Sequence, residues 1–484
     1  MSNGLDTDMA DHDQYTENTS RFLEYFKKTQ PFFNGKIELA DLREHNRGRG
    51  VIAKADIDQD EDLFSISRAG ILSVENSTLF KEPRGQQIIT DLDDSWLSLI
   101  LVLIYEREND NSPWQEYLAV LKDTKLDTLM YWTEEELAEF QASAIKDKIG
   151  KAGADETFRT KIVPAVQANS DLFPSASTLS KDDILSLAHW AGSTIMAYAF
   201  DIEKQPSVQA QDEEGFVSDE EEEFLPKGMV PMADMLNADA DRNNARLFYE
   251  EDTVVMRAIK PVKAGEELFN DYGPLPRADL LRRYGYITNN YVKYDVVELS
   301  TPFIIETVKS HLPAEDQKKL TDDYLAEIEE ALEDKDYWED AHIISQYTED
   351  DEDPLFPPGL QMLLYRLTAT SATKHAKRPE KIEAADREKM VNACLAVYSA
   401  RLKQYATAVQ EDQDLCRRFE DGIIEDTPSN RRKYMAWQVR LGEKQLLEIA
   451  MAHLPVYPPK NTNGASVHDT AQDERPAKRT KFSR

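Results

Sequence analysis

Residues 229–286 read MVPMADMLNADADRNNARLFYEEDTVVMRAIKPVKAGEELFNDYGPLPRADLLRRYGY, and the rest of the chain is best understood outward from them. An apolar run ends at Asn237, and a strand-like pair of segments follows it. A turn then places Tyr272 between polar residues and a glycine, and a predicted helix leads from it to a second aromatic cluster, YGY. We therefore expect the functional site to form around this stretch.

A glycine-rich segment lies far upstream, at residues 47–68, and reads RGRGVIAKADIDQDEDLFSISR. Its first residues satisfy G-x-G-x-x-A, which is the dinucleotide-binding fingerprint. That fingerprint must open a helix, whereas here short apolar pieces of strand length are separated by aspartates. The pattern therefore predicts two short strands and a turn, with glycines that let the backbone approach a ligand or another strand closely.

Predicted helices separate these two regions. The run SWLSLILVLIYER at residues 95–107 is typical of a buried helix, and residues 134–200 continue mostly helical. We expect a helical insertion at about residues 90–228 that includes an acidic, mobile loop at 205–223. Ser218 precedes the acidic run of this loop and could be phosphorylated, although a solvated loop without regulation is the favoured interpretation.

The two ends of the chain differ from its middle. Polar, acidic residues before position 18 predict disorder, and a helix is expected from Ser20 to Thr29. Beyond residue 296, apolar residues recur at helical spacing, which predicts an all-helical domain. The predicted organisation is a disordered segment at 1–17, a first domain at 18–296, a helical domain at 297–457 and a disordered tail at 458–484.

The charge balance is the most unusual property of the composition. The 484 residues include 91 acidic and 57 basic side chains, which gives a formal net charge of −34. Such a field repels nucleic acid and anionic membranes and attracts basic partners, although solubility alone could also explain it. We therefore expect a basic protein as partner, with neither direct nucleic-acid binding nor membrane association.

Cysteines and apolar runs narrow the class of protein further. The two cysteines, Cys394 and Cys416, lie far from the opening stretch, and no Cys/His cluster has the spacing of metal ligands. The most apolar run, residues 96–105, is about half as long as a membrane-spanning helix. The first residues lack the apolar core of a signal peptide. We expect a soluble intracellular monomer without a metal ion.

Three short segments carry a family resemblance. ADMLN at 233–237, GEELFNDYG at 265–273 and RRYGY at 282–286 resemble the SET-domain protein lysine methyltransferases. The most similar subgroup has a long helical insertion in the SET fold and a helical, Rubisco-methyltransferase-like substrate-binding domain behind it. RGRGVIAKADIDQDEDLFSISR resembles that family's first strands, while SPWQEYL, MAYAFDIE and VRLGEKQLL resemble its insertion and C-terminal domain. The resemblance covers most of residues 20–457 and implies an α+β fold with a β-rich SET domain.

One position departs from the family pattern. Many SET enzymes have Asn-His where this chain has Asn237-Ala238, so any contact made by that histidine is missing here. The pattern ADMLNAD is similar to a fungal subgroup that methylates a protein of the large ribosomal subunit. The resemblance therefore implies a ribosomal protein as the substrate.

The resemblance also implies roles for individual residues. Asn237 would hold the methyl donor, S-adenosyl-L-methionine, and Tyr272 would be the catalytic residue. The other cofactor contacts that it implies are Gly48, Arg49, Gly50, Ala238, Tyr272 and Tyr284. Tyr284, with Tyr198 and Tyr286, would wall a lysine channel, where aromatic faces favour an ammonium group. Taken singly, NDYG is a common β-turn, and Tyr284 could be a packing residue at a helix end.

Methyl transfer to lysine makes three demands on a site. The amine, with a reference pKa of about 10.4, must lose its proton. The nucleophile and the methyl group must be aligned, and water must be excluded. A tyrosine on a tight turn suits these demands because its hydroxyl can orient the amine and accept weak CH···O contacts. A nearby sulfonium charge lowers the amine pKa, so no dedicated base is needed. Asp271 and Glu267 are candidates by residue type, but the resemblance implies no such role for them, and neither is assigned.

A second class of function also fits the sequence. A SET scaffold or an acidic helical chaperone could hold basic proteins without modifying them, and the net charge of −34 serves this non-catalytic binding module equally well. The presence of both Tyr272 and Asn237 favours the enzyme. Binding of S-adenosyl-L-methionine separates the two, because a pure chaperone has no use for it.

The last ten residues, RPAKRTKFSR, are half basic on a very acidic chain. A nuclear import signal is the natural hypothesis, with a basic end of no function as the alternative. The protein is thus expected in the nucleus, with or without a cytoplasmic share. Removing residues 475–484 should shift the protein toward the cytoplasm and leave catalysis unchanged, as imaging of tagged full-length and shortened chains will test. An unchanged distribution would defeat the import hypothesis.

Overall fold

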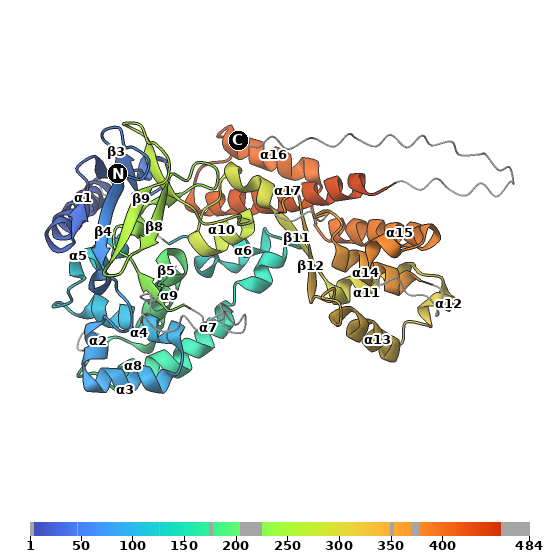
Figure 1. The fold of residues 1–484 in the computed structure, drawn as a ribbon, viewed down its shortest axis with the longest axis horizontal. Helices are drawn as coiled ribbons and strands as arrows, with labels where there is room; N and C mark the ends of the chain where they lie inside the picture. Colours follow the sequence, from blue (N-terminus) through green and yellow to red (C-terminus); the bar gives the residue numbers. More distant parts are fainter. Residues whose placement is uncertain are drawn as a thin grey trace, which may run out of the picture.

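The computed structural model describes residues 4–45, 47–124, 126–173, 178–203, 225–348, 353–369 and 378–455. Two lobes are visible in Figure 1, one with the β-sheets and the earlier helices and one with the later helices. Helix α17 (Pro428–His453) runs between them. The acidic loop predicted at 205–223, which contains Ser218, and the tail predicted at 458–484 lie outside the described residues. What the sequence predicts for them therefore stays a prediction.

Two four-stranded sheets form the centre of the first lobe, with the strand orders β1-β4-β9-β8 and β2-β3-β10-β7. Their strands are β1 (Phe32–Phe33), β2 (Ile37–Asp41), β3 (Arg49–Ala53), β4 (Asp62–Ser67), β7 (Asn237–Ala238), β8 (Ala245–Tyr249), β9 (Thr253–Ala258) and β10 (Glu267–Asn270). A ribbon of β5 (Ala199–Asp201) and β6 (Lys227–Met229) lies beside them. Strands β3 and β4 confirm the prediction of two short strands within residues 47–68.

Helices lie beside and below these sheets in Figure 1. They are α2 (Thr78–Lys81), α3 (Pro83–Leu92), α4 (Ser95–Glu108), α5 (Gln115–Lys122), α6 (Glu134–Ala138), α7 (Lys151–Thr157), α8 (Val163–Gln167) and α9 (Lys181–Tyr198). Helix α4 begins after Asp94, whose carboxylate accepts a hydrogen bond from the Leu97 backbone N–H at 2.9 Å. The residues from Leu97 to Ile104 are all buried, which confirms the predicted buried helix.

The N-terminal helix corrects one prediction. Helix α1 spans Gly4–Thr29, whereas the sequence predicted disorder through residue 17 and a helix from Ser20. The reason is tertiary: the Tyr15 ring lies between two guanidinium groups, 3.6 Å from that of Arg43 and 3.7 Å from that of Arg49. Asn18 is buried and donates to Asp123 at 2.8 Å. These partners are invisible in the local sequence.

The second lobe has its own apolar core, whose members run from Val297 to Leu454. Its helices are α11 (Thr301–His311), α12 (Ala314–Gln317), α13 (Asp322–Glu333), α14 (Pro358–Thr368), α15 (Ala384–Leu402) and α16 (Val409–Glu420), followed by α17. The predicted α+β class is confirmed, but this part is not wholly helical. Strands β11 (Val296–Ser300) and β12 (Ala341–Ser345) pair antiparallel, because their alternating side chains bury Val297, Leu299 and Ile344 in the core.

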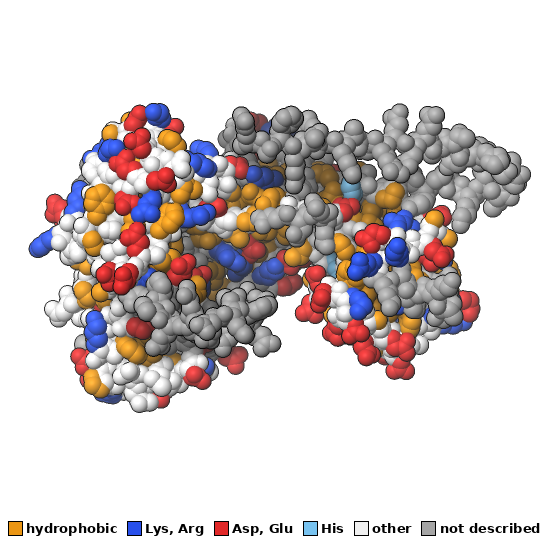
Figure 2. Space-filling view, in the orientation of Figure 1, with side chains coloured by type: hydrophobic (Ala, Val, Ile, Leu, Met, Phe, Trp, Pro, Cys, Tyr) orange, Lys and Arg blue, Asp and Glu red, His pale blue; other side chains and the backbone are white. Residues whose placement is uncertain are grey.

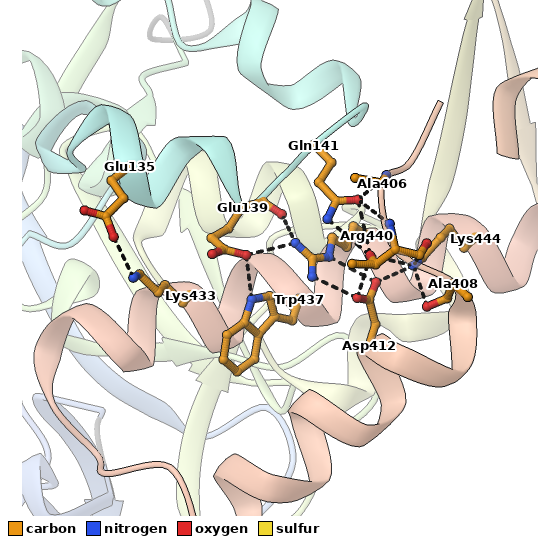
Figure 3. Close-up of polar contacts among 11 residues, drawn as sticks. Glu135, Glu139, Gln141, Ala406, Ala408, Asp412, Lys433, Trp437, Arg440 and Lys444 are labelled. Carbon is orange, nitrogen blue, oxygen red and sulfur yellow. Dashed lines mark hydrogen bonds and ion pairs between the residues drawn. The ribbon is translucent and has the colours of Figure 1, made fainter. Parts of the chain in front are cut away.

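Helix α17 joins the two lobes through apolar and charged contacts. A small core combines residues of the helical insertion, α10 (Arg277–Tyr284) and α17; its members are Leu129, Trp132, Phe140, Ile145, Leu281, Met435, Ala436 and Val439. Beside it, the almost fully buried Arg440 donates to both carboxylate oxygens of Asp412, at 3.0 and 2.8 Å, and to the Glu139 carbonyl at 2.5 Å (Figure 3). Lys444 pairs with the same Asp412 at 2.5 Å.

The described residues do not meet the requirements of a membrane-spanning helix, a three-ligand metal site or a disulfide. Within them, no helix has the length and apolarity needed to cross a bilayer, and no three potential ligands among His, Cys, Asp and Glu gather as a metal site would require. Cys394 and Cys416 are both buried and unpaired with one another.

Replacing Asp412 by alanine tests the buried charge network. The carboxylate is fully buried, and hydrogen bonds from Arg440 and Lys444 hold its pKa low although burial alone would raise it. Because Asp412→Ala leaves two buried cations without this partner, we expect it to reduce the free energy of unfolding by about 3–5 kcal/mol. Lys433→Ala, which breaks the exposed pair with Glu135 in Figure 3, should cost about 1 kcal/mol or less. Equal losses in denaturant titrations would contradict this.

Candidate active site

The strands β3, β10 and β7 converge on Asn237. Strand β10 pairs antiparallel with β3 and parallel with β7, which places Phe269 opposite Asn237 and Asn270 opposite Ala238. The Asn237 side-chain N–H₂ donates to the Arg49 carbonyl at 3.2 Å and to a Glu267 carboxylate oxygen at 2.7 Å. A residue predicted from a motif at 233–237 is thus joined to the glycine-rich segment from the start of the chain.

The glycine-rich segment is shaped by close packing on one side and open space on the other. A Cβ on Gly50 would lie 2.5 Å from the end of the Leu42 side chain and 2.9 Å from a Glu267 carboxylate oxygen, so a larger residue would have to displace both side chains. Gly48 has a φ of +63°, and no described atom lies within 4 Å of where its Cβ would be. The half-buried Gly48 therefore faces open space beside Asn237, as a ligand cradle would require.

Arg49 contributes its backbone to this region, not its side chain. The guanidinium is buried on the opposite side, where it donates to Thr19 at 2.8 Å and to the Val120 carbonyl at 3.1 Å. The predicted contact between Arg49 and a ligand is therefore limited to main-chain atoms. Arg47 is the nearby cation that remains partly exposed, and it pairs with Glu267 at 2.5 Å.

Three of the predicted tyrosines lie together just beyond β10. The Tyr272 and Tyr284 rings are stacked, with centroids 4.1 Å apart and planes inclined by 6°. Tyr286 is tilted against Tyr284 at 6.4 Å. Helix α10 supplies Tyr284 at its last residue, and Gly285 ends the helix with a φ of +77°. The cluster therefore lies at the end of the strand whose first residue, Glu267, contacts Asn237.

Tyr198, the last residue of α9, packs against the apolar core of the first lobe and not into the cluster of Tyr272, Tyr284 and Tyr286. It is nevertheless near enough to add to the raised pKa of Tyr272. Burial raises the pKa of the Tyr272 hydroxyl well above its usual range, and the neighbouring tyrosines add to the shift. Burial likewise raises the pKa of Tyr198, Tyr284 and Tyr286. All four hydroxyls therefore stay protonated at neutral pH, and Tyr272, Tyr284 and Tyr286 form a neutral, partly buried aromatic wall.

Sequence reasoning missed a buried carboxyl group three residues before Asn237. Asp234 belongs to the short 3₁₀ helix η7 (Ala233–Met235) and accepts a short hydrogen bond from the hydroxyl of the fully buried Tyr117. Burial raises the pKa of Asp234 to about 7. Met232, just before it, has a φ of +76°, a strained value for a residue with a side chain. The hydrogen bond between Tyr117 and Asp234 stabilises the turn at η7, which directly precedes Asn237.

Two further tyrosines were also missed. Tyr291 and Tyr294, in η8 (Asn289–Tyr294), form the buried base of the cluster with Leu280. Asn290 of the same element donates to Asp239 at 2.8 Å, which ties η8 to the segment after β7. The aromatic density of YITNNYVKY, directly after YGY, is the signal that could have indicated them.

Comparison with known proteins identifies this arrangement. Residues 48–273 match the model of the SET domain family, and residues 320–447 match that of the Rubisco LSMT substrate-binding family. The chain contains a SET domain. Its SET domain contains Gly48, Asn237 and Tyr272, whereas Tyr284 and Tyr286 follow the matched residues.

Several relatives resemble the chain over much of its length. Ribosomal lysine N-methyltransferase 4 of Saccharomyces cerevisiae is 35% identical over 305 residues, which cover 61% of this chain and 61% of that protein. N-lysine methyltransferase setd6 of Xenopus laevis is 29% identical over 282 residues, covering 57% of this chain and 59% of the relative. The chain thus spans less than two thirds of the length of these curated relatives.

Solved structures extend the likeness of the fold to both lobes. Rubisco LSMT bound to AdoMet superposes with a TM-score of 0.63 at 19% identity, covering 90% of this chain and 91% of that chain. Rubisco LSMT bound to sinefungin and monomethyllysine gives a TM-score of 0.64 at 20% identity, with 90% of each chain covered. A SET domain with a helical insertion and a helical second lobe is therefore the architecture of this protein.

The raised pKa of Asp234 predicts a defined pH dependence of stability. Since the folded pKa of about 7 exceeds the ordinary 3.8, the contribution of this group is fully present below pH 3.8 and is lost as the pH rises through about 7. Asp234→Asn retains an acceptor for Tyr117 but does not titrate. Wild type should therefore lose stability relative to the variant across this window, by at most about 1.4 kcal/mol per pH unit.

Melting temperatures measured from pH 4 to pH 8 check this expectation. Asp56→Asn is the control: a hydrogen bond from Lys263 lowers the pKa of Asp56 below 3.8, so this carboxylate stays ionised across the window and the variant profile should run parallel to wild type. Parallel profiles for wild type and Asp234→Asn would show that Asp234 does not titrate in this window.

Proposed function

We propose that the protein is an S-adenosyl-L-methionine-dependent protein-lysine N-methyltransferase. The observation that carries this proposal is the Tyr272–Tyr284 stack at the end of β10, the strand whose other end contacts Asn237. A place for a lysine side chain and a place for a methyl donor are thus adjacent within one SET domain. Relatives named as lysine methyltransferases support the proposal.

The residues around Gly48 fit the proposed cofactor. The backbone N–H of the half-buried Gly48 and the side-chain oxygen of Asn237 offer a donor and an acceptor to the amino acid part of the molecule. The Asn237 N–H₂ is itself bonded to Arg49 and Glu267. Arg47 pairs with Glu267 through Nη1 and has further guanidinium N–H groups for the carboxylate of the cofactor. Gly48, Arg49, Gly50, Asn237 and Ala238 would hold it, and when bound it supplies a methyl group activated by a sulfonium charge.

The aromatic wall defines what the chain itself does in the reaction. Because the pKa of Tyr272 is raised, its hydroxyl remains neutral and can accept a hydrogen bond from an amine without becoming a phenolate. The faces of Tyr284 and Tyr286 favour an ammonium group that enters between them. Their packing on the buried Tyr291 and Leu280 excludes water on the far side.

The second lobe favours a basic protein as substrate. All Asp and Glu side chains of residues 322–340, on and after α13, are exposed, and no described cation forms an ion pair with any of them. Figure 2 shows the corresponding red surface at the bottom of this lobe. We propose that the substrate is a basic protein attracted by this surface, and that it is a ribosomal protein, as the name of the yeast relative suggests. The resemblance of ADMLNAD to the fungal subgroup supports a protein of the large ribosomal subunit. We also propose a monomer that enters the nucleus.

Incubation with labelled S-adenosyl-L-methionine tests the activity and the substrate together. Large-subunit ribosomal proteins should be labelled on lysine, and histones should remain unlabelled. Labelling of histones alone would reject the ribosomal substrate but keep the enzyme. The non-catalytic binding module predicts no labelling and no heat of cofactor binding by calorimetry, so that result would reject the enzyme.

Replacing Tyr272 by phenylalanine isolates the hydroxyl. The ring stack with Tyr284 is preserved, so the fold and cofactor binding should be retained. We expect the methylation rate to fall by at least about 100-fold, because an oriented hydroxyl at the reacting centre is lost. Tyr249→Phe removes a remote hydroxyl that donates to the Asp201 carbonyl, and it serves as the matched control. Full activity of Tyr272→Phe would rule out this mechanism.

A further inference from the structure

The position of the aromatic wall depends on where helix α10 ends. Tyr284 is its last residue, and Gly285 turns the chain toward Tyr286 with a φ of +77°. A Cβ on Gly285 would lie 2.7 Å from the Asp127 carbonyl carbon and 2.9 Å from the Thr128 nitrogen. The backbone between the two tyrosines is therefore in direct contact with the backbone of the helical insertion.

Asp127 is in turn held by α17. Arg432 donates from Nε and Nη2 to one carboxylate oxygen of Asp127, at 2.8 and 2.6 Å. Its Nη1 donates to the Tyr131 carbonyl at 3.2 Å and to the nearly buried Glu136 at 2.9 Å. Arg432 thus fixes the 127–136 segment against which Gly285 packs.

The same helix also holds the other end of α10. The buried Arg277, the first residue of α10, pairs with the buried Asp295 and donates to the Gln438 carbonyl of α17 at 3.1 Å. Any Cβ on Gly442 would collide with Arg277 and Asp295, so α17 approaches this pair at a glycine. In contrast, no hydrogen bond joins α17 to β3 or β7 in the described chain.

We propose that α17 positions the lysine-facing tyrosines, with Arg432 as a positioning residue that acts through Asp127 and Gly285 on Tyr284 and Tyr286. The inference rests on the proposed function of this site. A helix of the substrate-binding lobe is then part of the support of the methyl-transfer site. Loss of Arg432 releases the end of α10 and leaves the glycine-rich segment and Asn237 in place.

The test compares Arg432→Met with Lys433→Met in the full chain. Lys433 is the next residue of the same helix and pairs with the exposed Glu135 (Figure 3), so it controls for loss of a charge from α17. Arg432→Met should lower kcat on large-subunit ribosomal proteins by about tenfold or more, because small misplacements of reacting groups are costly. Calorimetric affinity for S-adenosyl-L-methionine should stay within about twofold of wild type, since most of its proposed contacts lie in the glycine-rich segment and β7, and only Tyr272 and Tyr284 belong to the aromatic wall.

Hydrogen exchange supplies a readout that needs no activity. Amides of residues 284–288 should exchange faster in Arg432→Met than in wild type or Lys433→Met. If wild type methylates nothing, the proposed function fails, while the exchange result still tests the positioning role. If Arg432→Met matches Lys433→Met in both kcat and exchange, the positioning role is overturned.

Gly285→Ala gives a second variant that keeps every charge. The added Cβ presses on Asp127 and strains a positive φ, so it should displace the Tyr284–Tyr286 segment from the other side of the contact. It should also lower kcat without weakening cofactor affinity. Should Arg432→Met fail to fold, this variant decides the matter, and an unchanged kcat would overturn the inference.

Discussion

The side-chain amide of Asn237 holds together strands from distant parts of the chain. It donates to a carbonyl of β3 and to a carboxylate at the start of β10, while its own strand pairs with β10. The direction of β10 follows from these contacts, and that direction determines where Tyr272 emerges. Both the open backbone at Gly48 and the tyrosine stack thus depend on one local junction, stabilised behind it by the Tyr117–Asp234 contact.

Features with a local signature could be predicted from the sequence. The strands of residues 47–68, the buried helix α4 and the aromatic cluster at 282–286 each follow from apolar spacing or from a short motif. The extension of α1 could not be predicted, because it depends on the Tyr15 ring meeting two arginines from another segment. Asp234 and Tyr117 lie 117 positions apart, and no local pattern indicates that their side chains meet.

Acidic side chains occur in two different environments in this molecule, the interior and the surface. In the interior, carboxylates such as Asp412 and Asp295 are matched by arginine and lysine, so burial leaves little net charge. On α13 and the residues after it, carboxylates are exposed without described ion pairs and contribute a long-range field. The net charge of the chain therefore describes its surface, while its internal ion pairs define how the lobes fit together.

The contacts of helix α17 limit how lobes can be exchanged between related proteins. A chimera joined near residue 296 would take Arg432 from one parent and Asp127 from the other, and likewise Gly442 and Arg277. Such a hybrid would keep all the proposed catalytic residues from one parent, but the contacts of α17 that hold the aromatic wall in place would be mismatched. Substrate preference and turnover are then coupled traits, because one helix contributes to the recognition lobe and to the geometry of the channel.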